Sequence, residues 1–100
     1  MAPKRALIIS PGDSVANVLE DVAAGEEVAA RLGSETVLVR AVEPIPFGFK
    51  VALHDVAQGE PVYKYGEIIG KASLPIARGA LVHVHNLEGA RGRGDLQARR

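Results

Sequence analysis

Two histidines one residue apart, followed by an asparagine, form the segment of this sequence best suited to chemistry. The segment is His83–Asn86, and it follows two apolar residues. If Leu81–His85 is a strand, both imidazoles face the same side, about 7 Å apart. Imidazoles in that arrangement can bind one metal ion, or one can transfer a proton while the other orients it. Asn86 would then hydrogen-bond a hydroxyl-rich substrate. The alternative is that both histidines lie on the polar face of an edge strand.

Lys50 is a second candidate, because it follows a loop that contains two prolines and a glycine. The loop spans residues 44–48, and Gly48 can let backbone amides approach an anion. A lysine at the end of such a loop suits the recognition of a carboxylate. A solvent-facing lysine at the start of a strand is the alternative.

Other polar pairs give weaker indications of a site. His54 and Asp55 are adjacent, but neighbours on a strand face opposite sides, so a histidine–carboxylate pair is not favoured. Tyr63 and Tyr65 share a face if they lie on a strand, and we expect both to pack in the core or at its rim.

The composition excludes several classes of function. The chain has 100 residues, which makes one domain, and 12 basic residues balance 12 acidic ones. This balance gives no reason to expect a nucleic acid or a membrane as partner. The absence of cysteine excludes disulfides, zinc–thiolate sites, iron–sulfur clusters held by this chain and thiol catalysis. No run of apolar residues suits a signal peptide or a membrane span, so a cytoplasmic protein is expected.

Three short segments share a pattern that predicts a mainly β fold. Each has a β-branched residue, alanine, a variable residue, glycine, two variable residues and valine, and the segments begin at Val22, Val56 and Ile76. The pattern indicates a strand end, a tight turn whose glycine has positive φ, and a new strand. The spacing is too uneven for a solenoid. We therefore expect a compact β domain over residues 1–90 and a basic, flexible tail over residues 91–100.

The segments between these turns are rich in β-branched and apolar residues, as strands are. Residues 65–70 indicate a hairpin in which two backbones approach closely. Apolar residues spaced as in a helix predict one short helix within residues 14–31. The predicted strands are Ala6–Ser10, Thr36–Ala41, Phe49–Leu53, Val62–Tyr65, Ile68–Lys71 and Leu81–His85.

Three longer segments resemble the SAF domain of the altronate/galactarate dehydratase family. They are Ile45-Pro46-Phe47-Gly48-x-Lys50-Val51-Ala52-Leu53-x-Asp55, then Gly59-Glu60-Pro61-Val62-x-Lys64-Tyr65-Gly66-Glu67-x-Ile69-Gly70-x-Ala72, then Val82-His83-Val84-His85-Asn86. Their order and spacing match the family over residues 13–95. Sulfolactate sulfo-lyases resemble it too, and they have this domain as a separate small subunit.

The resemblance implies a β-clip fold and a role in a sugar-acid dehydratase, a carbon–oxygen hydro-lyase. The module would act on a small hydroxy-carboxylate together with a large subunit. A divalent metal (Fe²⁺, Mn²⁺ or Mg²⁺) would be shared with that subunit or held by it. The implied site has His83, His85 and Lys50 as catalytic residues, with both histidines as metal ligands, and Asn86, Gly48 and Lys64 as substrate-binding residues.

Two alternatives stay open. One is a non-catalytic module of the same fold that binds a carbohydrate or forms a homo-oligomer, because a fold alone does not decide function. The other is the small subunit of a sulfolactate-type carbon–sulfur lyase. Members of the family commonly have histidine where this chain has Phe49, and many begin a third alternating histidine where it has Leu81. These two departures put activity of the altronate type in question.

Overall fold

The structure is a computed structural model, and it describes residues 2–89. All helices and strands assigned in this range are β-strands, with no helix among them, and this confirms the mainly β class. The β-clip topology stays a prediction. The predicted tail, residues 91–100, lies outside the described residues. The first and last residues of the predicted domain, 1 and 90, lie outside them as well.

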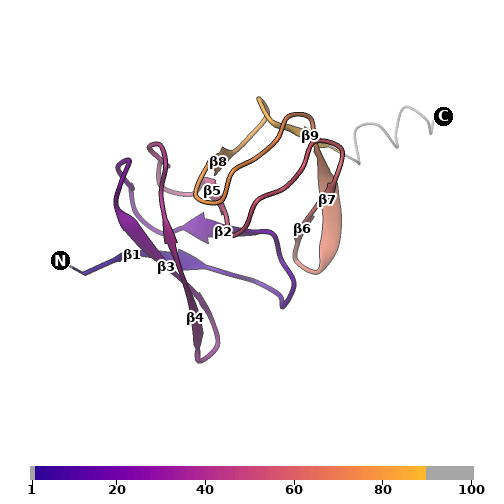
Figure 1. The fold of residues 1–100 in the computed structure, drawn as a ribbon. Coiled ribbons are helices and arrows are strands. Elements are labelled where there is room, and N and C mark those ends of the chain that lie inside the picture. Colours follow the sequence, from indigo (N-terminus) through magenta and orange to yellow (C-terminus); the bar gives the residue numbers. More distant parts are fainter. Residues whose placement is uncertain (1, 90–100) are drawn as a thin grey trace.

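The described residues form nine strands in two sheets (Figure 1). The larger sheet has the order β4-β3-β1-β2-β5-β8, and the smaller has the order β6-β7-β9. Strands β1 and β3 are parallel, and every other neighbouring pair is antiparallel. The strands are β1 (Lys4–Leu7), β2 (Val15–Val18), β3 (Glu27–Leu32), β4 (Glu35–Arg40), β5 (Lys50–Ala52), β6 (Pro61–Lys64), β7 (Glu67–Ala72), β8 (Leu81–Val82) and β9 (Leu87–Gly89).

Four tight turns, which we call corners, join these strands. Three of them are the predicted glycine turns, and the fourth lies in the proline-containing loop before β5. In each corner the amide after the glycine donates to the carbonyl three residues earlier, at 3.0–3.1 Å. The glycines have φ of 89°, 87°, 90° and 88°, as the third position of a type II turn requires. They are Gly25, Gly48, Gly59 and Gly79.

The corners associate in two pairs of the same design. An isolated β-bridge joins Val22 to Ile45 in one pair and Val56 to Ile76 in the other. An aspartate carboxylate in each pair accepts a bond from the partner corner, at 2.8 Å in both cases. Each pair stands at the base of a hairpin, β3–β4 or β6–β7, and Figure 1 shows these hairpins extending from different sides of the molecule. The chain therefore contains a corner–hairpin–corner unit twice.

Two clusters of buried side chains form the core, and strand β5 separates them. Val51 belongs to the first cluster and Ala52 to the second, because successive residues of a strand face opposite sides. Strand β2 divides in the same way, with Ala16 in the first cluster and Val15 in the second. Valine, alanine, isoleucine and leucine make up both clusters, as the low aromatic content predicts.

The predicted helix within residues 14–31 is wrong. This stretch forms β2, a corner and the start of β3. Strand β2 lies between β1 and β5 and is covered on both faces, so Val15, Ala16 and Val18 are all buried. A strand buried on both faces lacks the alternation that identifies strands in a sequence. The spacing of its valines then resembles that of a helix.

Most of the predicted strands are confirmed to within one residue at each end. The hairpin predicted around residues 65–70 is also confirmed, and the backbone of Glu88 lies against Gly70. The first strand is Lys4–Leu7 and therefore begins earlier than predicted. The last predicted strand, Leu81–His85, ends at Val82 instead.

Candidate functional site

Lys50 is the first residue of β5, and its side chain is half-buried. Its neighbours across the sheet are Asn17 on β2 and Val82 on β8. Burial, and then the positive charge of Lys64, hold the pKa of the Lys50 ammonium below its usual value of 10.5. Within residues 2–89 the one ion pair joins Arg5 to Glu20, so no described carboxylate neutralises Lys50.

Lys64 and Tyr65 complete a group that we call the lysine cluster: Lys50, Lys64 and Tyr65. The Lys64 ammonium lies 3.8 Å from the centre of the Tyr65 ring, in cation–π contact. Lys64 and Tyr65 both act electrostatically on Lys50, although they belong to the β6–β7 hairpin and Lys50 belongs to the larger sheet. The fold therefore brings two of the predicted lysines within electrostatic range of each other, which the sequence alone could not show.

Gly48 shapes the corner before Lys50. Its amide donates to the Val18 carbonyl at 3.0 Å, and its carbonyl accepts from the side chain of Asn17, also at 3.0 Å. The amides on either side of it are bonded as well, to Asp21 and to Pro46. These three amides are thus not available to an anion, contrary to the expectation for this loop. Asn17 was not predicted as a site residue, and it lies directly opposite Lys50.

His83 and His85 do not share a strand face. Residues 83–86 form a turn, in which the amides of Asn86 and Leu87 both donate to the His83 carbonyl, at 3.1 and 2.9 Å. The geometric argument for two convergent imidazoles is therefore wrong. The His83 ring packs edge-on against Phe49, with 4.8 Å between ring centres. Both histidines are exposed.

Asn86 is buried, and its side chain holds this turn together. Its Oδ1 accepts a bond from the His83 amide at 3.0 Å, and its Nδ2 donates to the Leu81 carbonyl at 2.8 Å. Both ends of the amide are thus used inside the chain. This placement gives Asn86 a structural role in addition to any contact with substrate.

Replacing Asn86 with alanine should lower the free energy of unfolding by about 2 kcal/mol, because the two partly buried backbone groups that it bonds lose their partners. Chemical denaturation measures this change. Asn86→Asp keeps the acceptor for the His83 amide but sets a buried carboxylate oxygen against the Leu81 carbonyl, so it should be no more stable than Asn86→Ala. If Asn86→Ala is as stable as the unchanged chain, the structural role is wrong.

The described residues do not form a complete metal site. No group of three or more histidine, aspartate and glutamate side chains within residues 2–89 is arranged to hold a metal ion. His83 and His85 supply two imidazoles at most, and a divalent metal in a protein usually takes three or more protein ligands.

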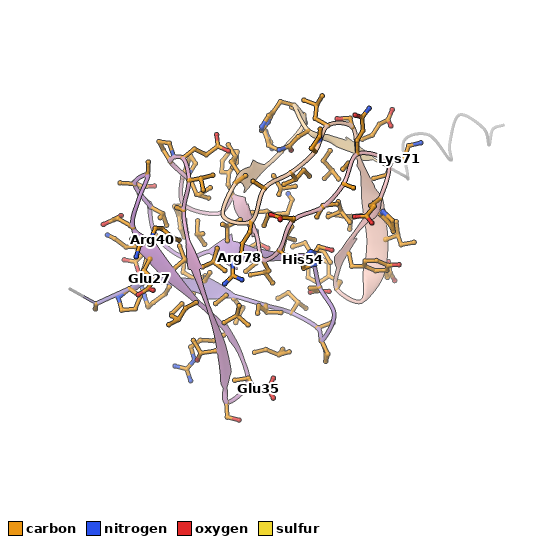
Figure 2. All side chains as sticks on the ribbon, viewed as in Figure 1. Glu27, Glu35, Arg40, His54, Lys71 and Arg78 are labelled. Atoms are coloured by element: carbon orange, nitrogen blue, oxygen red, sulfur yellow. The ribbon has the colours of Figure 1, made fainter. Side chains whose placement is uncertain are left out.

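His54 lines two shallow pockets, of about 270 and 340 Å³, which also share Gly12. Its Nδ1 lies 2.9 Å from the backbone carbonyl of Asp55, while the Asp55 carboxylate accepts a bond from the amide of Arg78. The side chains of His54 and Asp55 therefore do not form a catalytic pair. Figure 2 shows His54 and Arg78 in the middle of the view. None of the residues of the lysine cluster lines these two pockets.

The structure changes the interpretation of Tyr65. The sequence predicts packing in the core or at its rim, yet Tyr65 is 57% exposed, its ring contacts the Lys64 ammonium, and it acts electrostatically on Lys50. One signal could have drawn attention to it. Tyr65-Gly66 stands at a hairpin turn where asparagine-glycine is the favoured pair.

Comparison with known proteins gives a consistent set of relatives. A family described as "Altronate/galactarate dehydratase SAF domain" matches residues 4–90. An altronate dehydratase of Escherichia coli is 45% identical over 74 residues, and one of Bacillus subtilis is 36% identical over 74 residues. Both matches cover 74% of this chain and 14% of the relative, so the chain spans only a small part of either dehydratase.

A third relative has a different organisation. The (2R)-sulfolactate sulfo-lyase subunit alpha of Chromohalobacter salexigens is 36% identical over 73 residues. The match covers 71% of this chain and 78% of that subunit. A chain of similar size to this one therefore exists as a named subunit of a lyase. Within residues 2–89, no helix is long and apolar enough to cross a membrane.

Proposed function

Because the chain belongs to the altronate/galactarate dehydratase SAF domain family, we propose that it is the substrate-binding module of a sugar-acid dehydratase. In this proposal it binds a small hydroxy-carboxylate and acts with a larger chain that completes the site. The reaction is the elimination of water, in which a proton leaves the carbon next to the carboxylate and a hydroxyl leaves the neighbouring carbon.

The lysine cluster supports this proposal most directly. The two ammonium groups interact electrostatically, both lysines are half-buried, and within residues 2–89 no carboxylate forms an ion pair with either. Charge repulsion and lost hydration make this arrangement unfavourable in the free protein. The attraction of a bound carboxylate offsets both penalties. The cluster is therefore prepared for an anion, and a sugar acid supplies one.

Lys50 would also contribute to the elimination itself. When the proton next to a carboxylate is removed, negative charge accumulates on the carboxylate oxygens, and a partly desolvated ammonium stabilises that charge more strongly than one in water. His83 and His85 stay candidates for proton transfer, because both are exposed on the turn after β8. Any divalent metal (Fe²⁺, Mn²⁺ or Mg²⁺) would take further ligands from the larger chain.

The larger partner is supported by the lengths of the relatives and by the chemistry of this chain. The chain covers 14% of two altronate dehydratases and 78% of a sulfo-lyase subunit. In this proposal the lysine cluster holds the carboxylate, and no group of three or more metal-ligating side chains is found within residues 2–89. Co-expression with a large dehydratase-type chain from the same genome, followed by native mass spectrometry, should give a stable heteromer. Two chains that elute and ionise only separately would contradict this part of the proposal.

Calorimetry with altronate and galactarate tests the binding function itself. The purified chain should bind both acids, and chloride at the same ionic strength should not displace them. A chain that binds neither acid, alone or in the heteromer, would disprove the proposed function. A sulfolactate-type lyase would instead show tighter binding of sulfolactate than of either sugar acid.

The affinity for these acids should fall as the pH rises through the lowered pKa of Lys50. Lys50 binds a carboxylate only when protonated, so affinity disappears at a lower pH than an ordinary lysine would give. The stability of the free chain should change in the opposite direction. The folded state disfavours charged Lys50, so stability rises from the lowered pKa toward 10.5.

Calorimetry between pH 6 and pH 11 measures this dependence, and Lys50→Arg is the matched control. Arginine stays protonated throughout this range, so the affinity of the Lys50→Arg variant should depend less on pH than the affinity of the unchanged chain. Identical profiles for the two proteins would show that Lys50 does not contact the carboxylate.

A further inference from the structure

Tyr65 has a backbone conformation that a bulky residue rarely adopts. Its φ is +59°, and that of Gly66 is +73°; Tyr65 is the one non-glycine residue with positive φ within residues 2–89. Two consecutive positive φ values in the two-residue connection between β6 and β7 define a type I′ turn. The first position of this turn favours asparagine, aspartate or glycine. Tyrosine therefore strains the turn.

Tertiary contacts impose this conformation. The buried carboxylate of Asp13 accepts bonds from the amides of Tyr65 and Gly66, at 3.2 and 3.1 Å, and from that of Ser10 at 3.0 Å. The next residue, Ser14, donates its amide to the Tyr63 carbonyl at 2.9 Å, and its Oγ accepts from the Tyr63 amide at 3.0 Å. The hairpin is thus fastened to the start of β2. Strained residues persist where the surrounding structure fixes them in this way.

Core packing does not account for the tyrosine. The residue is 57% exposed, the centre of its ring lies 3.8 Å from the Lys64 ammonium, and it acts electrostatically on Lys50. An asparagine would satisfy the same turn without strain, but it would remove the ring from the two lysines. Strain that is retained beside a polar cluster indicates a function for the side chain.

We propose that Tyr65 is a specificity-determining residue of the lysine cluster, whose phenol binds a hydroxyl group of the acid that Lys50 and Lys64 hold by its carboxylate. This inference rests on the proposed function. The two lysines alone would accept any small carboxylate. A phenol both donates and accepts hydrogen bonds, so it can recognise the hydroxyl that distinguishes a sugar acid. Asp13 is the positioning residue, because it holds the turn that presents Tyr65.

Galactarate and adipate provide the test, because both are six-carbon dicarboxylates and they differ only in their hydroxyl groups. Calorimetry should show that the unchanged chain binds galactarate about tenfold more tightly than adipate. Tyr65→Phe keeps the ring over which Lys64 lies, so it should keep the affinity for adipate and lose the preference for galactarate. If Tyr65→Phe loses affinity equally for both acids, or keeps its preference for galactarate, the assignment is overturned while the proposed function stands. If the unchanged chain binds neither acid, both fail.

The strain supplies an independent measurement that needs no ligand. Tyr65→Asn creates the favoured asparagine-glycine turn, so the melting temperature should rise by about 4 °C while the preference for galactarate disappears. A lower melting temperature would show that the ring is needed for folding, and the assignment would fail.

Asp13→Ala and Asp55→Ala form a matched pair for the positioning role. Each substitution removes a carboxylate that accepts a hydrogen bond from a backbone amide. The Asp13 carboxylate accepts from the Tyr65 amide of the strained turn, and the Asp55 carboxylate accepts from the Arg78 amide. Asp13→Ala should reduce the preference for galactarate about tenfold, and Asp55→Ala should not alter it. Equal preferences in the two folded variants would contradict a positioning role for Asp13, and if Asp13→Ala does not fold, Asp13→Asn replaces it in this comparison.

Discussion

Replacing Lys50 with methionine is expected to weaken galactarate binding by about 100-fold and to leave the melting temperature unchanged or higher. The ammonium supplies the charge that attracts the carboxylate, so its loss removes most of the affinity. The same ammonium is half-buried, has a lowered pKa and is not neutralised by a described carboxylate. Methionine fills a similar volume without the cost of desolvating a charge. Lower affinity with retained stability is the mark of a residue kept for binding rather than for folding.

Lys71→Met is the control for this experiment. Lys71 is an exposed lysine of strand β7 (Figure 2) and lies outside the lysine cluster. Its replacement removes the same charge from the whole protein, so any general electrostatic effect on binding should appear in it. Calorimetry and thermal denaturation of both variants give the answer. An equal loss of affinity in the two variants would show that Lys50 acts only through net charge.

Gly79→Ala is expected to destabilise the chain by about 3 kcal/mol or more, through two separate effects. The φ of Gly79 is +88°, which is strained for alanine, and an added Cβ would collide with the carbonyl oxygen of Arg40. That carbonyl belongs to the end of β4, where the Val42 amide also donates to the Gly79 carbonyl at 3.0 Å. The collision would therefore separate the Gly79 corner from the end of β4.

Gly25→Ala separates strain from collision. Gly25 has nearly the same φ, +89°, but an added Cβ meets no atom within 4 Å. Its replacement should cost about 1 kcal/mol from backbone strain alone. Denaturation of both variants in urea measures the difference. If the two variants are equally stable, the close approach of Gly79 to Arg40 is not a determinant of the fold.

The sequence was most informative where strands have one exposed face. The β6–β7 hairpin and three of the four corners could be predicted, because turn glycines have local causes. The β3–β4 hairpin was not predicted, because most of β3 falls within the predicted helix. The fourth corner was recognised only as a loop, since Pro46 stands where the other corners have alanine. Strand β2 was mistaken for a helix because both of its faces are buried. These failures have a shared origin, which is that the environment of a residue depends on distant parts of the chain.

The candidate site was predicted only in part, because the placement of its residues also depends on distant parts of the chain. Lys50 and Lys64 could be chosen from their residue type and from the family resemblance, but their proximity depends on how the β6–β7 hairpin meets the larger sheet. The bonds from Asp13 and Ser14 to that hairpin link residues about 50 positions apart, and no local pattern indicates them. The histidine prediction depended on a strand that ends at Val82. Residue type identified candidates, whereas tertiary contacts decided which of them meet.

A nuclear magnetic resonance titration of the isotopically labelled chain with galactarate tests the central claim most directly. At low ligand occupancy, we expect the largest chemical-shift changes at the Cε resonances of Lys50 and Lys64 and at the amides of Asn17 and Tyr65. Lys71 should not respond. Shifts confined to the turn at residues 83–86 or to the pockets beside His54, or no shifts at any ligand concentration, would contradict it.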